Sequence, residues 1–308
     1  MRIGIDLGGT KTEIVVLDDK GYRRFQKRIK TQKDSYQYIV RDIVQLVKTA
    51  ESTLKQYCSI GLCIPGSIDT ERQVVKNANT TVLNGQPLAK DIAKLLERPV
   101  RIANDANCLA LSEAVDGAAA GADVVFGVIV GTGCGGGLVV NSQVIAGANG
   151  LTGEWGHNRL NDLSGEEQTG YDCYCGKTGC VETWISGTAL ARHYRDAAIN
   201  SGLLNDEDSS PCAEEIVLLA TTGNALAEQQ VRLLENRMAR ALAQIINIID
   251  PNVIVLGGGL SNVDRLYENI PALWQQWIFS EYPVNTRLVK AQYGDASGVR
   301  GAAWLWPQ

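Results

Sequence analysis

The chain has 308 residues, 45% of them hydrophobic and 20% charged, which predicts two domains that each bury a core. Its net charge at pH 7 is -5 and it has no basic cluster, which argues against a nucleic-acid surface. No apolar run approaches the ~20 residues of a membrane span, and Asp6 interrupts the segment where a signal peptide is apolar, so we expect a cytoplasmic protein without a membrane partner.

The first predicted element is a β-hairpin at residues 3–17 with a glycine-rich turn. The turn offers free amides and polar side chains at Gly8, Gly9, Thr10, Lys11 and Thr12. Glycines permit the backbone conformations of a tight turn, and such a turn suits a phosphate chain. Asp6 ends the first strand, where a carboxylate can face the metal ion of a nucleotide. An ordinary hairpin without a ligand explains the two glycines about as well.

Apolar residues at helical spacing predict a helix at 36–54 that packs one face on the first sheet. Further along, residues 100–103 read as a strand and residues 106–113 as a helix. Asn104 and Asp105 therefore occupy the junction between them. Asp105 is a candidate for proton transfer, but an aspartate at this position can also serve only as the helix N-cap.

A second glycine hairpin at residues 126–140 superposes on the first at an offset of 123 residues and implies two related halves. Its turn contains Gly131, Thr132 and Gly133. Residues 131, 133 and 136 also satisfy the dinucleotide pattern G-x-G-x-x-G, but that pattern requires a helix to follow. Residues 138–140 read as a strand, so we set the Rossmann interpretation aside.

Cys173, Cys175 and Cys180 lie in one short segment, and His157 precedes them by sixteen residues. Three sulfurs and one imidazole complete the tetrahedral shell of a closed structural zinc. A zinc ion here would fix two neighbouring carboxylates, those of Glu154 and Glu182. The alternative is a disulfide or a merely buried cysteine cluster, although one intervening residue between Cys173 and Cys175 makes a disulfide there strained.

A third glycine cluster, Gly257, Gly258 and Gly259, follows a predicted helix at 231–249 and a predicted strand at 253–256. Ser261 or Asn262 is expected to cap the next helix. Residues without side chains outside a strand end leave room for a flat adenine, although a plain turn explains them too. Residues 161–171 and 201–213 read as loops, and His193, in a helix at 188–198, reads as a surface or packing residue without a function.

In chain order, the motifs are Asp6-Leu-Gly-Gly-Thr-Lys11, Asn104-Asp105, Gly131-Thr-Gly133, Glu154-x-x-His157, Cys173-x-Cys175-Gly-x-x-Gly-Cys180-x-Glu182 and Gly257-Gly-Gly259. Together they resemble the ROK family of sugar kinases over nearly the whole chain. Residues 77–87, 116–121 and 298–307 further resemble its bacterial fructokinase or mannokinase branch.

The resemblance implies an α/β fold of the actin-like ATPase type, a duplicated ribonuclease H-like fold with two domains around a cleft and a zinc-binding loop. The smaller domain would comprise residues 1–114 and 298–308, and the larger one residues 115–297. Closure of the domains on the sugar is the expected motion. The family usually forms homodimers.

The resemblance also implies the chemistry and the site. Asp105 would be the catalytic base for transfer of the γ-phosphoryl group of ATP, with Mg²⁺ as the second cofactor beside structural Zn²⁺. The sugar contacts would be Gly66, Asn84, Asn104, Asp105, Glu154, His157 and Glu182. Fructose is the predicted substrate and fructose 6-phosphate the product, with mannose as a further substrate. The alternatives are an N-acetylglucosamine or glucose kinase, or a sugar-sensing repressor, which we disfavour because the first hairpin begins at residue 3.

Overall fold

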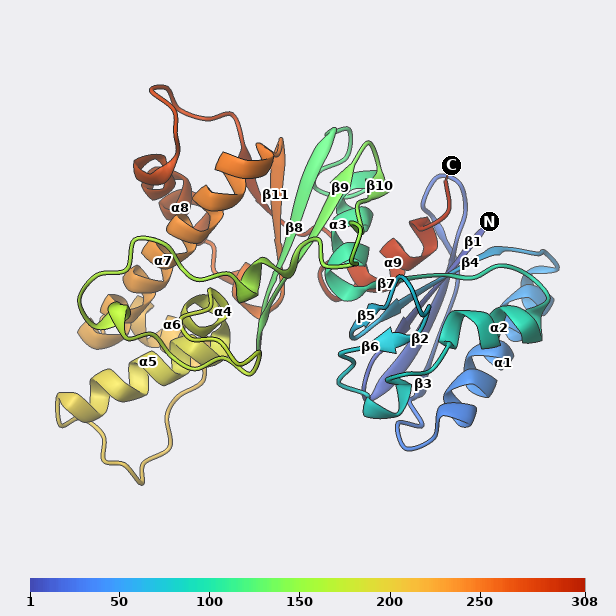
Figure 1. Cartoon of the computed structure of the whole chain (residues 1–308), viewed down its shortest axis with the longest axis horizontal. Coiled ribbons are helices and arrows are strands. Elements are labelled where there is room, and N and C mark those ends of the chain that lie inside the picture. The colour runs from blue at the N-terminus through green and yellow to red at the C-terminus, as the bar shows by residue number, and fades with distance from the viewer. Residues whose placement is uncertain (308) are drawn as a thin grey trace. The chain divides into compact units, whose positions relative to one another are not determined.

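The computed structural model describes residues 1–307; Gln308, the last residue of the predicted segment 298–308, lies outside the described residues. The chain forms two compact units (Figure 1). The first unit comprises Met1–Gly127, Gly137–Thr152 and the chain from Ala291 onward, and the second comprises Val128–Gly136 and Gly153–Lys290. The predicted domain boundaries at 114 and 298 stay a prediction. Among the described helices, none combines the length and apolarity needed to cross a membrane.

A five-stranded sheet with the order β3-β2-β1-β4-β7 forms the centre of the first unit. Its strands are β1 (Arg2–Leu7), β2 (Lys11–Leu17), β3 (Arg23–Lys30), β4 (Ser59–Ile64) and β7 (Arg101–Asn104). β4 pairs in parallel with β1 and with β7, whereas β1, β2 and β3 are antiparallel neighbours. The remaining elements are the strand pair β5 (Ser67–Ile68) and β6 (Val75–Lys76), and the helices α1 (Tyr36–Leu54), α2 (Leu88–Leu96), α3 (Asp105–Val115) and α9 (Ser297–Trp304).

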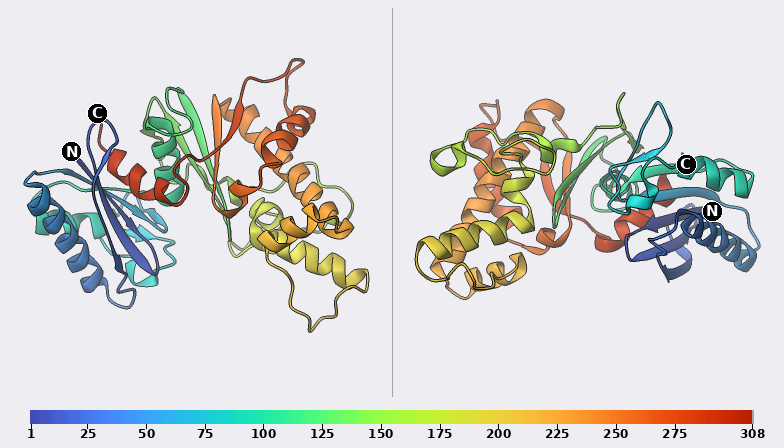
Figure 2. Two further views of the ribbon diagram at one scale, coloured as in Figure 1. Left: turned by 180° about the vertical axis from the view of Figure 1, so that it is seen from behind. Right: turned by 60° about the horizontal axis from the view of Figure 1, so that its bottom comes forward.

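The two faces of this sheet are covered in different ways. Ile3, Ile5 and Leu7 alternate along β1 and join the hydrophobic core that includes the buried face of α1. Gly4 and Gly61 face α9 instead, since a Cβ atom at either position would lie about 2 Å from a backbone oxygen of that helix. Only glycine therefore lets α9 pack this closely on β1 and β4. Figure 2 shows α1 and α9 on opposite sides of the sheet.

A second five-stranded sheet has the order β10-β9-β8-β11-β12. Its strands are β8 (Val124–Val130), β9 (Cys134–Val140), β10 (Gln143–Val144), β11 (Val253–Gly257) and β12 (Arg287–Lys290). Gly127 and Gly137 likewise let α3 pack closely, because a Cβ at either would lie under 3 Å from an α3 atom. Gly127 is the counterpart of Gly4 at the offset of 123 residues, so the same position serves close helix packing in both hairpins.

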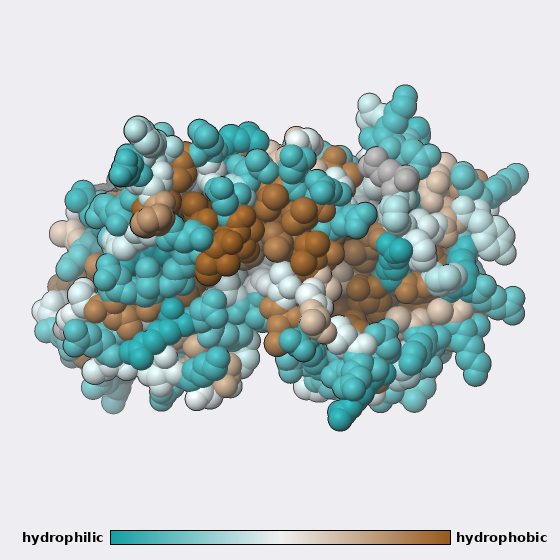
Figure 3. Space-filling view, turned by 45° about the horizontal axis from the view of Figure 1, so that its top comes forward, coloured by the Kyte–Doolittle hydropathy of each residue, from teal (hydrophilic) through white to brown (hydrophobic). Residues whose placement is uncertain are grey.

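The second unit contains the helices α4 (Glu182–Ile185), α5 (Gly187–Asn200), α6 (Ala213–Thr221), α7 (Ala225–Ile249) and α8 (Leu266–Trp274). α7 is the central one, with buried residues along its length and packing against α5, α6 and α8. Most charged side chains lie outside this core, and the space-filling view shows hydrophilic and hydrophobic groups interspersed on the visible face (Figure 3).

Most predicted elements are confirmed, with corrections at their ends. The predicted helix at 36–54 and both glycine hairpins form, and no helix follows the second hairpin, as β9 shows. The helix predicted at 231–249 begins at Ala225, where Asn224 caps it. The predicted cap at Ser261 or Asn262 is wrong, because both residues lie inside a 3₁₀ turn (Gly259–Asn262) and α8 begins only at Leu266.

Candidate active site and metal centre

Hydrogen bonds fix the conformation of the turn of the first hairpin. The Gly8 amide donates to the Lys11 carbonyl oxygen at 3.0 Å, and the Thr31 hydroxyl donates to the Gly8 carbonyl oxygen at 2.8 Å. Thr12 is buried, and its hydroxyl forms a hydrogen bond with the hydroxyl of Thr31. Thr12 therefore stabilises the turn and is not exposed to a ligand. Gly9, Thr10 and Lys11 are exposed and remain available to a ligand.

The turn of the second hairpin is held by its neighbours in the second unit. The Gly187 amide donates to the Gly131 carbonyl oxygen at 2.7 Å, and the Thr188 hydroxyl to the Thr132 carbonyl oxygen at 2.9 Å. At Gly133 a Cβ would lie 2.7 Å from the Glu182 carboxylate, which also accepts from the Cys134 amide at 3.2 Å. The predicted residue Glu182 therefore lies against the predicted phosphate turn.

A cavity of about 740 Å³ in the second unit brings two of the predicted glycine motifs together. Gly131 and Thr132 line it from the second hairpin, and Gly259 lines it from the third glycine cluster. Gly258 has φ +83° and a Cβ there would lie 2.5 Å from the Val130 carbonyl oxygen, so this position accepts only glycine. Gly257 ends β11 and is buried, so the strand delivers the cluster to the edge of the cavity.

The remaining wall of this cavity comes from residues that the sequence did not indicate. They are Gly187, Thr188 and Ala191 of α5, Cys212, Ala213, Glu214 and Val217 at the start of α6, and Leu260, Asn262 and Val263. The beginning of α6 adjoins a segment that reads as a loop, and no spacing in it points to a ligand. The apolar side chains among these residues suit the flat face of a heterocyclic base.

Asp105 is the first residue of α3, at the end of β7 in the first unit. Asn104 is the N-cap, because its side-chain oxygen accepts from the Asn107 amide at 2.8 Å. The alternative role of Asp105 as the cap is therefore wrong, although its Oδ1 does accept from the Ala106 amide at 2.9 Å. Solvent reaches Asp105, yet desolvation by the surrounding protein raises its pKa above the ordinary value.

Asp6, near the end of β1, and Asp105, directly after β7, lie at the same edge of the first sheet, with β4 between the two strands. β1, β4 and β7 run side by side and carry Asp6, Ile64 and Asn104 at their ends. Burial is the main cause that raises the pKa of Asp6, and the nearby Asp105 carboxylate contributes in the same direction. Two carboxylates at one edge of a sheet favour binding of a cation, such as the metal ion that accompanies a nucleotide.

Gly66 and Asn84 meet at the same backbone in the first unit. Gly66 has φ +135°, and a Cβ there would lie 2.8 Å from Ala78 Cα. The Asn84 side chain accepts from the Ala78 amide at 2.8 Å and donates to its carbonyl oxygen at 3.1 Å. Asn84 is also exposed, so one further N–H and one lone pair remain for a sugar hydroxyl.

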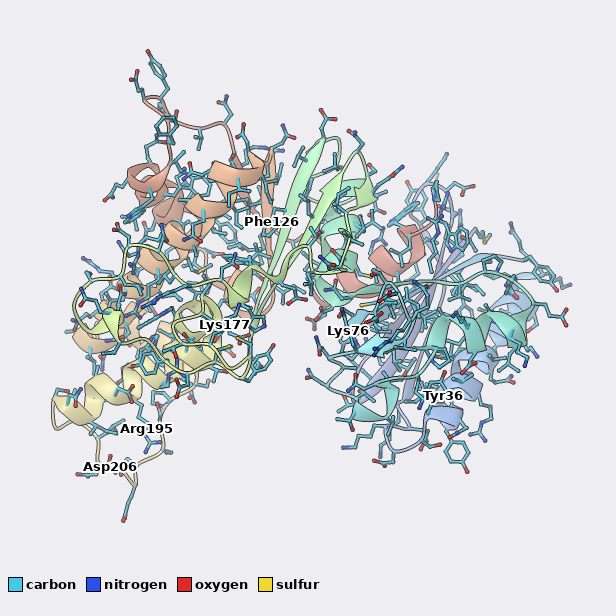
Figure 4. All side chains as sticks on the ribbon, viewed as in Figure 1. Tyr36, Lys76, Phe126, Lys177, Arg195 and Asp206 are labelled. Carbon is cyan, nitrogen blue, oxygen red and sulfur yellow. The ribbon has the colours of Figure 1, made fainter. Side chains whose placement is uncertain are left out.

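The predicted metal ligands converge in the second unit. His157, Cys173, Cys175 and Cys180 each offer a ligand atom, and these four atoms lie within 4.8 Å of one another. The closest pairs are Cys173 Sγ and His157 Nδ1 at 3.5 Å, and Cys175 Sγ and Cys180 Sγ at 3.6 Å. All three cysteines are free, which contradicts the disulfide alternative. Lys177 marks the turn between them in Figure 4.

These separations fit a tetrahedral zinc site. Metal–sulfur bonds of about 2.3 Å at tetrahedral angles place the sulfurs about 3.8 Å apart. His157 presents Nδ1 to the sulfurs, while its Nε2 lies 3.0 Å from the exposed Tyr174 hydroxyl. One imidazole nitrogen therefore points to the metal position and the other away from it. Glu154 begins the 3₁₀ turn that ends at His157, so both side chains come from one rigid element.

His193 is buried rather than on the surface, and packing is its role. It is 6% exposed, and its Nδ1 accepts from Arg237 Nη1 at 2.9 Å, so the ring is neutral with its proton on Nε2. Burial, followed by the charges of Arg237 and Arg192, lowers the pKa of His193 from 6.5 to about 3.

This depressed pKa predicts a loss of stability in acid. Between pH 6.5 and about 3 the unfolded chain binds a proton that the folded chain does not, so stability is full above pH 6.5 and falls as the pH drops. The slope is about 1.4 kcal/mol per pH unit for one proton. In His193→Asn the amide oxygen still accepts from Arg237. Urea unfolding from pH 7 to 4 should show a shallower decline for this variant, and equal slopes would contradict the prediction.

The family model that describes the ROK family matches residues 2–308. The N-acetyl-D-glucosamine kinase of Mannheimia succiniciproducens is 40% identical over 311 residues, covering 99% of both chains, and that of Pasteurella multocida is 38% identical with the same coverage. The ROK hexokinase of Thermus thermophilus has a TM-score of 0.85 at 30% identity, covering 99% of this chain and 97% of its own. A ROK glucokinase of Streptomyces griseus, in complex with glucose and AMPPNP, has a TM-score of 0.75 at 28% identity, covering 98% and 97%.

These comparisons confirm the actin-like α/β fold and correct the predicted substrate. The full-length relatives at 36–40% identity are N-acetyl-D-glucosamine kinases, so the fructokinase assignment is wrong and the alternative is favoured. That assignment relied on the resemblance of residues 77–87, 116–121 and 298–307 to fructokinases and mannokinases. Two of the polar groups in the first of these segments serve the local fold: Asn84 closes a turn onto Ala78, and Thr80 is buried. The chain belongs to the ROK family, and its full-length relatives place it among the sugar kinases of that family.

Proposed function

We propose that the protein phosphorylates N-acetyl-D-glucosamine with ATP and forms N-acetyl-D-glucosamine 6-phosphate. Full-length similarity to N-acetyl-D-glucosamine kinases supports the sugar, since identity of 36–40% extends over 99% of the chain. The S. griseus glucokinase bound to AMPPNP supports ATP as the donor. The observation that carries the proposal within this chain is the exposed Asp105 carboxylate at the start of α3, at the edge of the sheet where β1 with Asp6 also ends.

Asp105 acts as the general base. Its carboxylate accepts the proton of the sugar hydroxyl while that oxygen attacks the γ-phosphorus, and ADP leaves with the bridging oxygen. A raised pKa makes the carboxylate a better proton acceptor than an ordinary aspartate. Asn104 supports this position, because its cap on α3 fixes the first turn of the helix from which Asp105 projects.

The remaining predicted residues bind the two substrates. Gly8, Gly9, Thr10 and Lys11 in the first unit, and Gly131, Thr132 and Gly133 in the second, offer amides and hydroxyls to phosphate oxygens. The cavity beside Gly259 takes the adenosine end of the nucleotide. Gly66, Asn84, Asn104, Glu154, His157 and Glu182 are the proposed sugar contacts, with His157 using Nε2 for this purpose.

Two metal ions complete the proposal. Asp6 is the residue that would face Mg²⁺, and the ion would supply neutralisation of phosphate charge during transfer. Zn²⁺ would be held by His157, Cys173, Cys175 and Cys180, whose ligand atoms lie within 4.8 Å of one another. Its role is structural, since four protein ligands leave no open position. A homodimer stays a prediction from family resemblance.

The direct test is identification of the product. The purified protein is incubated with MgATP and N-acetyl-D-glucosamine, and the phosphorylated sugar is identified by ³¹P and ¹³C NMR. We expect one phosphomonoester at C6 for each ADP released. ADP release without a sugar phosphate, or phosphate on another hydroxyl, would contradict the proposed reaction.

A further inference from the structure

The segment that leads into the metal cluster, residues 158–172, is attached to α7 by a buried ion cluster. Glu167 is 8% exposed and accepts from Arg237 Nε at 2.8 Å. Arg240 Nη2 donates to both oxygens of the same carboxylate, at 2.9 and 2.8 Å. Arg237 and Arg240 are 7% and 4% exposed. One carboxylate therefore joins two arginines on the buried face of α7, one turn apart.

The same arginines reach beyond Glu167. Arg240 Nη1 donates to the carbonyl oxygens of Asn161 and Asp162, at 3.2 and 2.8 Å. The Asp162 side chain accepts from Trp277 Nε1 at 2.8 Å, and Asp162 itself has φ +56°. Hydrogen bonds therefore fix both the backbone and a side chain of the segment. They also stabilise the left-handed backbone conformation of Asp162, which is unfavourable for a residue with a side chain.

Aromatic packing continues the attachment toward the metal. Arg237 lies over the Trp184 ring with its guanidinium carbon 4.8 Å from the ring centroid, and it donates to His193. Tyr171 packs against both His193 and Trp184, with centroids 5.0 and 5.2 Å away. Tyr171 directly precedes the cysteine segment, and Trp184 lies two residues after Glu182. Arg237 therefore contacts Glu167, which precedes the three cysteines in the chain, and Trp184, which follows them.

We propose that Glu167 is a positioning residue that docks residues 158–172 on α7 independently of the metal, so that the loop carrying His157 and Glu182 is anchored twice. A bound metal would hold the cysteines at 173–180 together, and the ion cluster of Glu167, Arg237 and Arg240 fixes the segment that precedes them. This inference rests on the proposed function for the roles of His157 and Glu182 in sugar binding, but the docking itself does not.

Charge explains why a carboxylate is needed at this position. The hydrogen bonds and charges of Arg237 and Arg240 outweigh burial and hold the pKa of Glu167 below its ordinary value. Without Glu167 these two guanidiniums would face each other in a buried site, where unpaired charge is strongly unfavourable. The segment would then lose its attachment while α7 keeps its own packing.

The test compares Glu167→Gln with Glu235→Gln as a matched control. Glu235 is 3% exposed on the same helix and accepts from Arg265 Nε at 2.6 Å and from Asn269 Nδ2 at 2.8 Å. Both variants therefore remove one buried carboxylate that is bonded to an arginine and that links α7 to another part of the second unit. Of the two glutamates, only Glu167 belongs to the segment between His157 and Cys173. Hydrogen exchange of peptides at 158–172 and 173–181 is measured in metal-loaded protein and after chelation.

In wild type we expect chelation to release residues 173–181 while residues 158–172 stay protected. In Glu167→Gln we expect residues 158–172 to exchange faster with or without metal, and zinc to transfer to a chelator at least about tenfold faster. Glu235→Gln should show neither change. Equal exchange and equal zinc loss in the two variants would overturn the proposal, as would release of both peptides together on chelation of wild type.

A second variant covers the possibility that Glu167→Gln does not fold. Arg240→Lys keeps the charge but loses the planar fork that bonds both Glu167 oxygens, so the same peptide should exchange faster. Exchange unchanged from wild type would then overturn the proposal. A wild-type protein without kinase activity would refute the proposed function, whereas the exchange of residues 158–172 would still decide the inference.

Discussion

Replacing Asp105 by Asn should lower kcat for sugar phosphorylation by about 10²- to 10⁴-fold, because the amide cannot accept the hydroxyl proton. Sugar binding should change little, since Asn keeps an oxygen and the size of the side chain. Fold stability should not fall at neutral pH either. Burial raises the pKa of Asp105, so its charge costs folding energy that the amide does not. Steady-state kinetics, calorimetric sugar binding and thermal unfolding measure the three effects.

Asp116→Asn is the matched control for this prediction. Asp116 ends the same helix α3 and pairs with Arg300, away from the proposed base. This variant should keep kcat near wild type, because it changes a carboxylate at the other end of the helix and leaves Asp105 in place. If Asp105→Asn turns over as fast as wild type, Asp105 is not the base.

Loss of a metal ligand should have the second large effect. In Cys175→Ser the hydroxyl is a poor zinc ligand, so bound zinc should fall from about one ion per chain to well below that value. His157 and Glu182 then lose their fixed positions, since Cys173 lies 3.5 Å from His157 Nδ1 and 3.6 Å from Glu182 Oε1. The KM for the sugar should rise about ten- to a hundredfold.

Cys58→Ser is the control for general effects of cysteine replacement, because Cys58 is buried in the first unit, outside the cluster. It should keep both zinc and sugar affinity. Metal analysis by mass spectrometry and kinetics at varied sugar concentration provide the measurements. A zinc-free Cys175→Ser with wild-type KM would show that the metal does not support the sugar site.

The sequence predicts those features that depend on local spacing. The apolar period of α1 follows from contacts three and four residues apart, and its predicted bounds match the structure. The metal cluster follows from ligand types within a short segment, and its four atoms converge as predicted. All residues of each pattern lie within about 25 consecutive positions, so a single sequence is enough to recognise them.

Features made by residues far apart in the chain could not be predicted in the same way. The wall that Cys212, Ala213, Glu214 and Val217 add to the cavity beside Gly131 depends on how α6 packs in the second unit. The attachment of Glu167 to α7 joins residues about 70 positions apart, and nothing in the local sequence marks it. His193 shows the same limit, since its burial depends on three separate elements.

The prediction of fructose as the substrate is wrong because it interprets a local sequence pattern as part of the sugar site. A run of asparagines and threonines at 77–87 suggests groups for sugar hydroxyls, but such residues equally close turns. Asn77 has φ +56° and Asn84 bonds the backbone of Ala78, so their polarity is explained by the fold. Specificity for an acetamido group depends on a few contacts that composition does not reveal.

The central claim, that this kinase acts on N-acetyl-D-glucosamine, is tested most directly by comparing kcat/KM for four sugars with saturating MgATP. N-acetyl-D-glucosamine, glucose, mannose and fructose are assayed by coupled ADP release under identical conditions. We expect N-acetyl-D-glucosamine to give the highest kcat/KM, by at least about tenfold, which corresponds to about 1.4 kcal/mol in transition-state binding. A higher kcat/KM for fructose or any other of the three sugars would contradict the claim.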